Sequence, residues 1–269
     1  MRLRLLSVLV LASACAAQTP VDRALGAMRQ HREADAETIL RQELDQHPDD
    51  LPARRLLVRV LGFRGDLDAA RAEVDALSKR LPDGDPGAWI ELGHAYELAH
   101  RFEEALAAYD EAAARAPASP AGPREGGMRC ARWGEVDAAA PRLEEAVKRG
   151  AKDAEVFHVL GLVRLHQKNL DGAEAAYRQG LAVDPTDPAN MLGLATVAVT
   201  RDDAKGALLA YDALLAKHPR YGAGYLGRAW ALARLGRKAE AKEALDQAEE
   251  LGASPEHVKK QRELVNALP

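Results

Sequence analysis

Aromatic residues and cysteine are both scarce in this chain of 269 residues. Phe, Trp and Tyr make up 4% of it, while hydrophobic residues reach 47%, many of them Ala and Leu. That composition favours closely packed helices over a sheet-based core. Two cysteines, Cys15 and Cys130, are too few for a disulfide framework, so Cys130 is expected to be a small buried residue of a helix.

The chain also lacks an excess of positive charge. Its formal net charge is -4, and its isoelectric point is about 6.1. Proteins that bind nucleic acid usually present a basic surface. We therefore expect no nucleic-acid partner.

Motifs of the common enzyme classes are missing as well. There is no Gly-x-x-x-x-Gly-Lys phosphate loop, no Gly-x-Ser-x-Gly nucleophile elbow and no His-Glu-x-x-His zinc motif. His158 and His166 have no acid at a ligand spacing between them, so no metal site is predicted. Carboxylate pairs such as Glu103 and Glu104 fit a solvated helix face. The sequence predicts a protein that is not an enzyme and uses no cofactor.

The first residues have the pattern of an export signal. Arg2 and Arg4 precede an uncharged run over residues 5–17, which is shorter than the roughly 20 residues needed to span a bilayer. The run ends in Leu-Ala-Ser-Ala-Cys, which resembles the bacterial lipobox and implies a lipid on Cys15. Cleavage after Ala14 or Ala16 without a lipid uses the same small residues.

A period of 34 residues runs through the rest of the chain. Each repeat has a large apolar residue with an alanine four positions before it, and most have a proline eight positions after it. The large residues, spaced 34 or 35 apart, are Leu40, Val74, Tyr109, Leu143, Tyr177, Tyr211 and Leu245. The alanines are Ala36, Ala70, Ala105, Ala139, Ala173, Ala207 and Ala241. Such a period is typical of stacked supersecondary units.

Each repeat is predicted to hold two helices. Apolar residues recur at helical spacing over residues 103–115, and Pro117 ends that helix because proline lacks the amide donor. Small residues such as Gly93 and Gly161 stand where the two helices cross, opposite the alanines. One such hairpin cannot bury its apolar face alone, so neighbouring repeats must stack.

The third repeat carries a specific motif. Its residues are Trp89, Leu92, Gly93 and Tyr96 in the first helix, and Ala105, Tyr109 and Pro117 in or after the second. This pattern resembles the tetratricopeptide repeat family. The resemblance implies an all-α fold, namely a right-handed αα solenoid of about seven helix-turn-helix repeats with a C-terminal capping helix.

The predicted organisation is a signal peptide over residues 1–14, a solenoid over 17–253 and a capping helix over 254–269, begun by Ser254 and Pro255. The repeats are 17–50, 51–85, 86–119, 120–153, 154–187, 188–221 and 222–253. Repeat one lacks the first-helix motif and is expected to be frayed. Repeat four is expected to be the weakest, because it holds Gly126, Gly127 and Pro141.

The resemblance also implies a groove along the first helices that binds other proteins. The predicted groove residues are Arg55, Arg59, His94, His158, Leu162, His166, Leu192, Thr196, Leu226, Trp230 and Arg234. The groove is expected to be charged near its start and apolar near its end, with Trp230 as the main anchor point. Some members of the family hold acidic tails with a clamp of lysine and asparagine. The matching first-helix positions here have no asparagine, so that function is not carried over.

The favoured function is a non-catalytic scaffold for partner proteins in the bacterial cell envelope, in the periplasm or at the outer membrane through a lipid on Cys15. The family resemblance implies roles such as pilus assembly, outer-membrane protein assembly or organisation of wall enzymes, among which the sequence does not choose. One alternative is a cytoplasmic adaptor that keeps residues 1–17 as a helix. Another is an enzyme with an all-helical active site.

Overall fold

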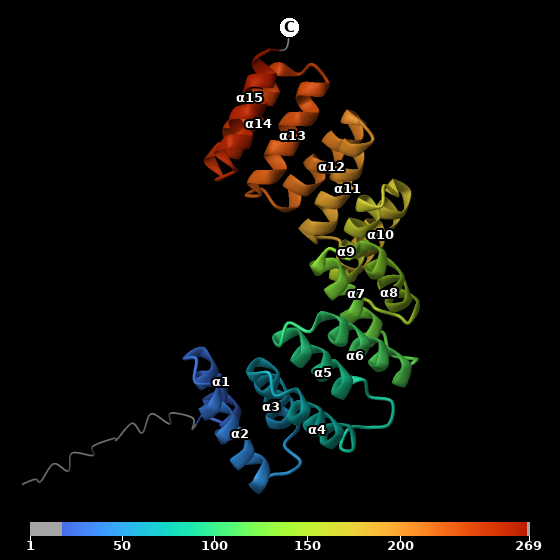
Figure 1. Ribbon diagram of the computed structural model, residues 1–269. Coiled ribbons are helices and arrows are strands. Elements are labelled where there is room, and N and C mark those ends of the chain that lie inside the picture. The colour runs from blue at the N-terminus through green and yellow to red at the C-terminus, as the bar shows by residue number, and fades with distance from the viewer. Residues whose placement is uncertain (1–17, 268–269) are drawn as a thin grey trace, which may run out of the picture. The chain divides into compact units, whose positions relative to one another are not determined.

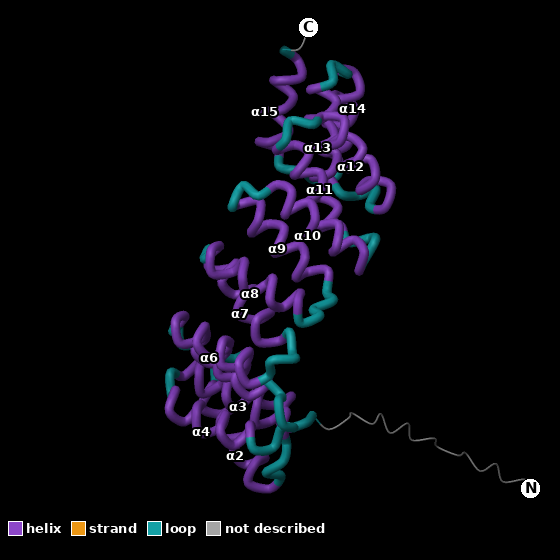
Figure 2. Tube along the Cα trace, turned by 90° about the vertical axis from the view of Figure 1, so that its right-hand side faces the viewer, coloured by secondary structure: helices purple, strands orange, loops and turns teal. Residues whose placement is uncertain are grey.

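The computed structural model describes residues 18–267, and these form fifteen α-helices joined by short loops, with no strand among them (Figures 1 and 2). The helices are α1 (Pro20–Arg29), α2 (Glu33–Gln46), α3 (Leu51–Arg64), α4 (Leu67–Ser78), α5 (Gly87–Leu98), α6 (Phe102–Arg115), α7 (Ala121–Trp133), α8 (Val136–Lys148), α9 (Ala154–His166), α10 (Leu170–Val183), α11 (Pro188–Thr200), α12 (Ala204–Lys217), α13 (Gly222–Arg234), α14 (Lys238–Glu250) and α15 (Pro255–Asn266). The predicted all-α class is confirmed, and one helix pair falls within each predicted repeat.

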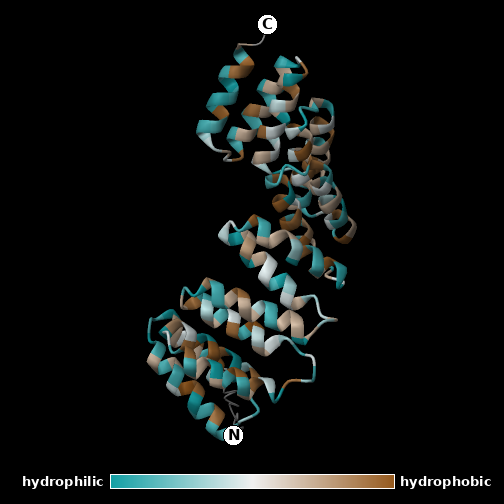
Figure 3. Cartoon of the chain, turned by 45° about the vertical axis from the view of Figure 1, so that its right-hand side comes forward, coloured by the Kyte–Doolittle hydropathy of each residue, from teal (hydrophilic) through white to brown (hydrophobic). Residues whose placement is uncertain are grey.

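The chain divides into two compact bodies. The N-terminal body ends at Ala108 and the C-terminal body begins at Tyr109, within α6. In the N-terminal body, α3 packs on α2, α4 and α5. In the C-terminal body, α7 packs on α8, α9 on α10, α11 on α12, and α13 on α14. Within each body, hydrophobic and hydrophilic residues alternate along the helices (Figure 3), as expected for helices that bury one face.

Several helices begin at a side chain that caps them. Asp50, Asp153 and Asp187 each accept a hydrogen bond from the backbone amide three residues later. Such a cap satisfies an amide that has no partner within the helix. In repeat one, Thr19 and Asp22 form a reciprocal capping box, so α1 is a complete helix. The expectation that repeat one is frayed stays a prediction.

The last helix of the described chain differs from expectation in two details. Helix α15 packs on α13 and α14 and buries Val258 and Val265, as a capping helix would. However, Ser254 makes no side-chain capping bond, and Leu264 is exposed to solvent although its apolar character suggested a packed position. Pro255 at the first turn still sets the start of the helix.

The core of both bodies follows the 34-residue period. All seven periodic alanines are fully buried, and so are six of the seven large residues, while Tyr211 is nearly so. The large periodic residues form a column through the core, and the first helices pack against this column with very little room between them. A Cβ atom added to Gly161 would lie 2.3 Å from Cε1 of Tyr177, and one added to Gly193 would lie 2.4 Å from the same atom. The ring of Tyr177 thus occupies space that only glycine leaves open on both helices.

Repeat four shows how its glycines are used. A Cβ on Gly127 would lie 2.7 Å from Cγ of Leu143, so glycine allows α7 and α8 to approach closely. Cys130 is fully buried in α7, as expected for a small apolar residue. Pro141 lies inside α8 on its exposed side, where it removes one backbone hydrogen bond of the helix. The low intrinsic stability predicted for this repeat stays a prediction.

The close approach at Gly161 generates a test. Gly161→Ala should lower the free energy of unfolding by about 1–3 kcal/mol, because the added methyl group overlaps the buried ring of Tyr177. In Gly26→Ala, the nearest atom to the new Cβ is 4.0 Å away. This control should raise stability by up to about 1 kcal/mol through helix propensity. Urea denaturation followed by circular dichroism measures both. Equal effects of the two substitutions would contradict the packing argument.

Candidate functional site

An apolar pocket lies on the first helices of repeats four and five, within the C-terminal body. Its volume is about 430 Å³. Its apolar lining comes mainly from Met128 of α7 and from Val159, Leu162 and Val163 of α9. Ligand sites commonly have this size and this kind of lining. We call it the α7–α9 pocket.

Leu162 is the most exposed apolar residue of the pocket, with 47% of its surface accessible. Its neighbour Gly161 faces Tyr177 and the core, and one residue further along α9 turns the side chain by about 100°. The core stripe and the outward stripe of one helix are therefore adjacent in sequence. An apolar side chain left in water on the outward stripe is typical of an interaction site when it borders a pocket.

Charged groups border the α7–α9 pocket. Arg132 and His166, in the last turns of α7 and α9, line it on one side, and Glu155 lines it from the first turn of α9. A guanidinium nitrogen of Arg124 lies 3.2 Å from a carboxylate oxygen of Glu155. Among the described residues, the side chains of Arg132 and His166 have no hydrogen bond or ion pair. The Arg132 guanidinium and the His166 imidazole are therefore available to a ligand.

Two of the predicted groove residues, Leu162 and His166, meet in the α7–α9 pocket. His158 lies on another side of α9, where its ring is 6.0 Å from that of Tyr177. Burial lowers the pKa of His158, although Asp187 and a hydrogen bond with the backbone of Ala189 oppose that effect. Burial also raises the pKa of Tyr177 to about 12. His158 is thus a mostly neutral packing residue at pH 7.

The apolar groove residues predicted in repeats six and seven are less exposed than an open binding groove would require. Leu192, Leu226 and Trp230 are half-buried and pack against the buried cluster of α11–α14. Thr196 is exposed, but its hydroxyl donates a hydrogen bond to the carbonyl of Leu192. Arg234 pairs with Asp202 and places its guanidinium carbon 6.0 Å from the ring centre of Trp230. Their role in binding stays a prediction, and a substitution there would also disturb the fold.

In the N-terminal body, the predicted groove residues form an ionic cluster. Glu91 of α5 is buried and accepts hydrogen bonds from Arg59, at 2.6 Å and 2.9 Å. Nδ1 of His94 is 3.5 Å from the same carboxylate. Burial alone would raise the pKa of Glu91, but His94 and Arg59 outweigh it and hold that pKa below its ordinary value. Arg55 lies beside α5, with Nη2 3.0 Å from the position of a Cβ on Gly87.

Two apolar residues of this body were missed by the sequence reasoning. Phe63 and Leu98 are 48% and 39% exposed, in the last turns of the adjacent helices α3 and α5. Each follows a predicted groove residue, Arg59 or His94, by four positions and so shares its helix face. Extending the stripe by one turn would have found them. The start of the groove therefore combines charged and apolar groups.

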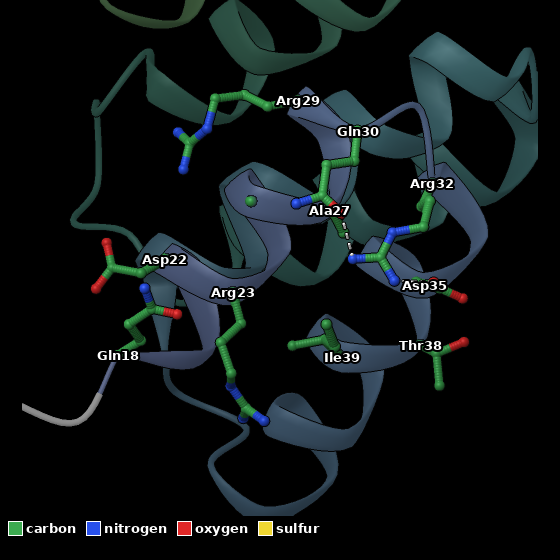
Figure 4. A pocket seen from close by; sticks show the side chains of 11 residues that line it. Gln18, Asp22, Arg23, Ala27, Arg29, Gln30, Arg32, Asp35, Thr38 and Ile39 are labelled. Atoms are coloured by element: carbon green, nitrogen blue, oxygen red, sulfur yellow. Dashed lines mark hydrogen bonds and ion pairs between the residues drawn. The ribbon is translucent and has the colours of Figure 1, made fainter.

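A larger hollow of about 670 Å³ lies on α1 and α2 in the N-terminal body (Figure 4). Its lining is polar and includes Arg23, Arg29, Arg32 and Asp35. Arg32 is bound within the chain, to Asp35 at 3.1 Å and to Gln30 at 2.8 Å. Among residues 18–267, no helix pair precedes α1 to cover this face. The polar lining suits a face that water reaches.

Comparison with known proteins bears on these features. Models described as "Tetratricopeptide repeat" match residues 27–87, 86–119, 132–188 and 192–256. The chain belongs to the tetratricopeptide repeat family. No curated protein matches the sequence.

Several solved tetratricopeptide repeat structures share the fold. The C-terminal part of a repeat protein from Cytophaga hutchinsonii has a TM-score of 0.66 at 15% identity, over 90% of this chain and 98% of that one. YrrB, described as having an unusual peptide-binding site, has a TM-score of 0.60 at 16% identity, over 70% and 96%. PilF from Pseudomonas aeruginosa has a TM-score of 0.56 at 18% identity, over 78% and 97%. These identities show a common fold and no more.

No catalytic or metal constellation is found in this repeat protein within residues 18–267. That part of the chain has no group of three or more His, Cys, Asp or Glu placed to hold a metal ion. Burial raises the pKa of the Cys130 thiol, which disfavours the reactive thiolate. None of the matched family models is an enzyme family. Over the same residues, no helix is long and apolar enough to cross a bilayer.

The ionic cluster at Glu91 predicts a pH dependence of stability. The pKa of this carboxyl in the folded repeat protein lies below its ordinary value of 4.5, so ionised Glu91 favours the folded state above that pH. This contribution should disappear as the pH falls below 4.5 and through the folded-state pKa. Glu91→Gln should cost about 1–3 kcal/mol at pH 7 and should remove this component of the acid dependence.

Fluorescence of Trp89 on α5 reports this part of the chain. We suggest urea titrations in a Trp133→Phe, Trp230→Phe background between about pH 3 and pH 6, with and without Glu91→Gln. Parallel pH profiles for the two proteins would show that Glu91 is not responsible.

Proposed function

We propose that this protein is a non-catalytic scaffold that binds a segment of a partner protein on the first helices of its repeats. Tetratricopeptide repeat proteins generally act in protein–protein interaction, and the comparisons show the family. The observation that carries the proposal for this chain is the α7–α9 pocket, where Leu162 is half exposed beside an apolar hollow. The peptide-binding site in the name of YrrB is consistent with this function.

The shape of the α7–α9 pocket suits a helix or an extended peptide. A partner would insert one apolar side chain between Met128 and Leu162, and nearby contacts would exclude water around it. The exposed Phe63 and Leu98 on the N-terminal body provide a second apolar area for the same kind of contact. In repeats six and seven, Leu226 and Trp230 contribute only through the parts of their side chains that the core leaves accessible.

The pocket predicts that Leu162→Asp abolishes capture of the partner from an envelope extract. The substitution places a charge where the partner's apolar anchor would be desolvated, and it should cost little stability because Leu162 is already half exposed. The matched control is Leu209→Asp on α12, where leucine is 72% exposed and lies outside the pocket. Circular dichroism checks that both variants fold. Capture by Leu162→Asp at the level of the control would rule out the pocket.

We further propose that the protein is exported and acts in the cell envelope. The support lies in the sequence of residues 1–17, with two arginines, an uncharged apolar run and a lipobox-like end at Cys15. These residues, Cys15 included, lie outside the described part of the chain. Several acyl chains on a modified Cys15 would anchor the repeats to a membrane stably, whereas one chain binds only marginally.

A single substitution tests the anchor. Cys15→Ser should move the protein from the membrane fraction to the soluble fraction of a bacterial host, since the thiol that carries the lipid is lost. Mass spectrometry of the N-terminus identifies the cleavage site and any lipid in the original protein. If the two proteins fractionate alike, the lipid anchor is refuted. An uncleaved N-terminus would refute export as well.

A further inference from the structure

We infer that the segment bound in the α7–α9 pocket carries a carboxylate about one helical turn from its apolar anchor. This inference rests on the proposed function and adds the chemistry of the partner. The guanidinium of Arg132 and the imidazole of His166 line the pocket, and neither side chain is paired with another described residue. An apolar hollow with an unpaired guanidinium on one side fits an apolar side chain next to an acidic one.

Arg234 occupies in repeat seven the place that Arg132 has in repeat four, and it is paired with Asp202, 32 residues earlier. The residues 32 positions before Arg132 and His166 are His100 and Gly134, neither of which is acidic. Repeat four thus has the arginine of this pair without the acid, and His166 in repeat five has no acid at that spacing either.

The other end of the pocket, at Glu155, carries negative charge. Glu155 lies eleven residues before His166 on α9, which corresponds to about 16 Å along the helix axis. Arg124 pairs with Glu125, Asp153 and Glu155, and Arg129 also pairs with Glu125, so two cations face three carboxylates there. A bound segment is therefore oriented, with its acidic part at Arg132 and His166 and away from Glu155.

The distance between the partner's apolar anchor and its carboxylate follows from the positions of Leu162 and His166 on α9. His166 is one turn beyond Leu162, which is about 6 Å along the axis. A helical partner would need its carboxylate three or four residues from the anchor, and an extended partner about two residues away. This recognition differs from a lysine–asparagine clamp. The apolar anchor would supply most of the contact with the pocket, and Arg132 would favour partners that carry an acidic residue beside that anchor. A nucleic acid would be disfavoured by the net charge of -4.

The test is a selection of short random peptides displayed on phage against the full chain. We expect enriched peptides to have Asp or Glu within one turn of a large apolar residue. Synthetic versions should bind roughly fivefold more weakly to Arg132→Gln, and the loss should shrink at high salt. His166→Gln should weaken binding less, because the glutamine amide also donates hydrogen bonds. Arg234→Gln is the matched control, because this arginine lies outside the pocket and already has a partner. It should leave the affinity unchanged.

The outcomes separate the inference from the proposed function. Enriched peptides that need Leu162 but lack acidic residues, or that bind the Arg132→Gln, His166→Gln protein equally well, would overturn the inference and leave the pocket as a binding site. If no enriched peptide is sensitive to Leu162→Asp, both the inference and the proposed pocket fail. Acidic peptides that bind independently of Leu162 would show only attraction between charges, and would also overturn the inference.

Discussion

The close approach of two helices within each repeat is the constraint on which the structure depends. It requires an alanine on the second helix and a glycine or alanine on the first, beside one large side chain of the column. Tyr177 illustrates it, since its ring fills the space left by Gly161 and Gly193. Because helices at short distance exclude water from long stretches of apolar surface, this arrangement supplies most of the stability of a repeat and of its contact with the next.

The same constraint decides where function is located. One stripe of a first helix packs against its own repeat and its neighbours. Substitutions on the remaining stripe leave the packing of the core unchanged. In α9 the two stripes are adjacent, so Gly161 is fixed by packing while Leu162 is free to serve a partner. In α13 the division is less clean, because Leu226 and Trp230 also pack on the core cluster. A scaffold of this kind therefore varies its partners by changing side chains on a constant frame.

Charged residues on the surface follow the repeat as well. Arg142 bonds to Asp110, and Arg234 to Asp202, each 32 residues earlier within the C-terminal body. In the N-terminal body, Arg59 bonds to Glu91, 32 residues later. The exposed pairs Arg142–Asp110 and Arg234–Asp202 contribute little stability, about 0–1 kcal/mol each. Their larger effect is to occupy charges that would otherwise be available to a ligand, as Arg132 is in the α7–α9 pocket.

The sequence by itself determined the repeat, its period and the all-α class. Those properties depend on local spacing, such as the alanine four positions before Tyr177 and the proline after most second helices, and local spacing is visible in a single chain. The candidate site was only partly predictable. Leu162 and His166 were found from the helix stripe, whereas Phe63 and Leu98 were missed, and so was the capping box of α1. Only the tertiary structure decided that Trp230 shares its surface with the core and that Arg132 lacks an acid. Burial and pairing of a side chain depend on residues about one period away, and the periodicity of one helix carries no information about them.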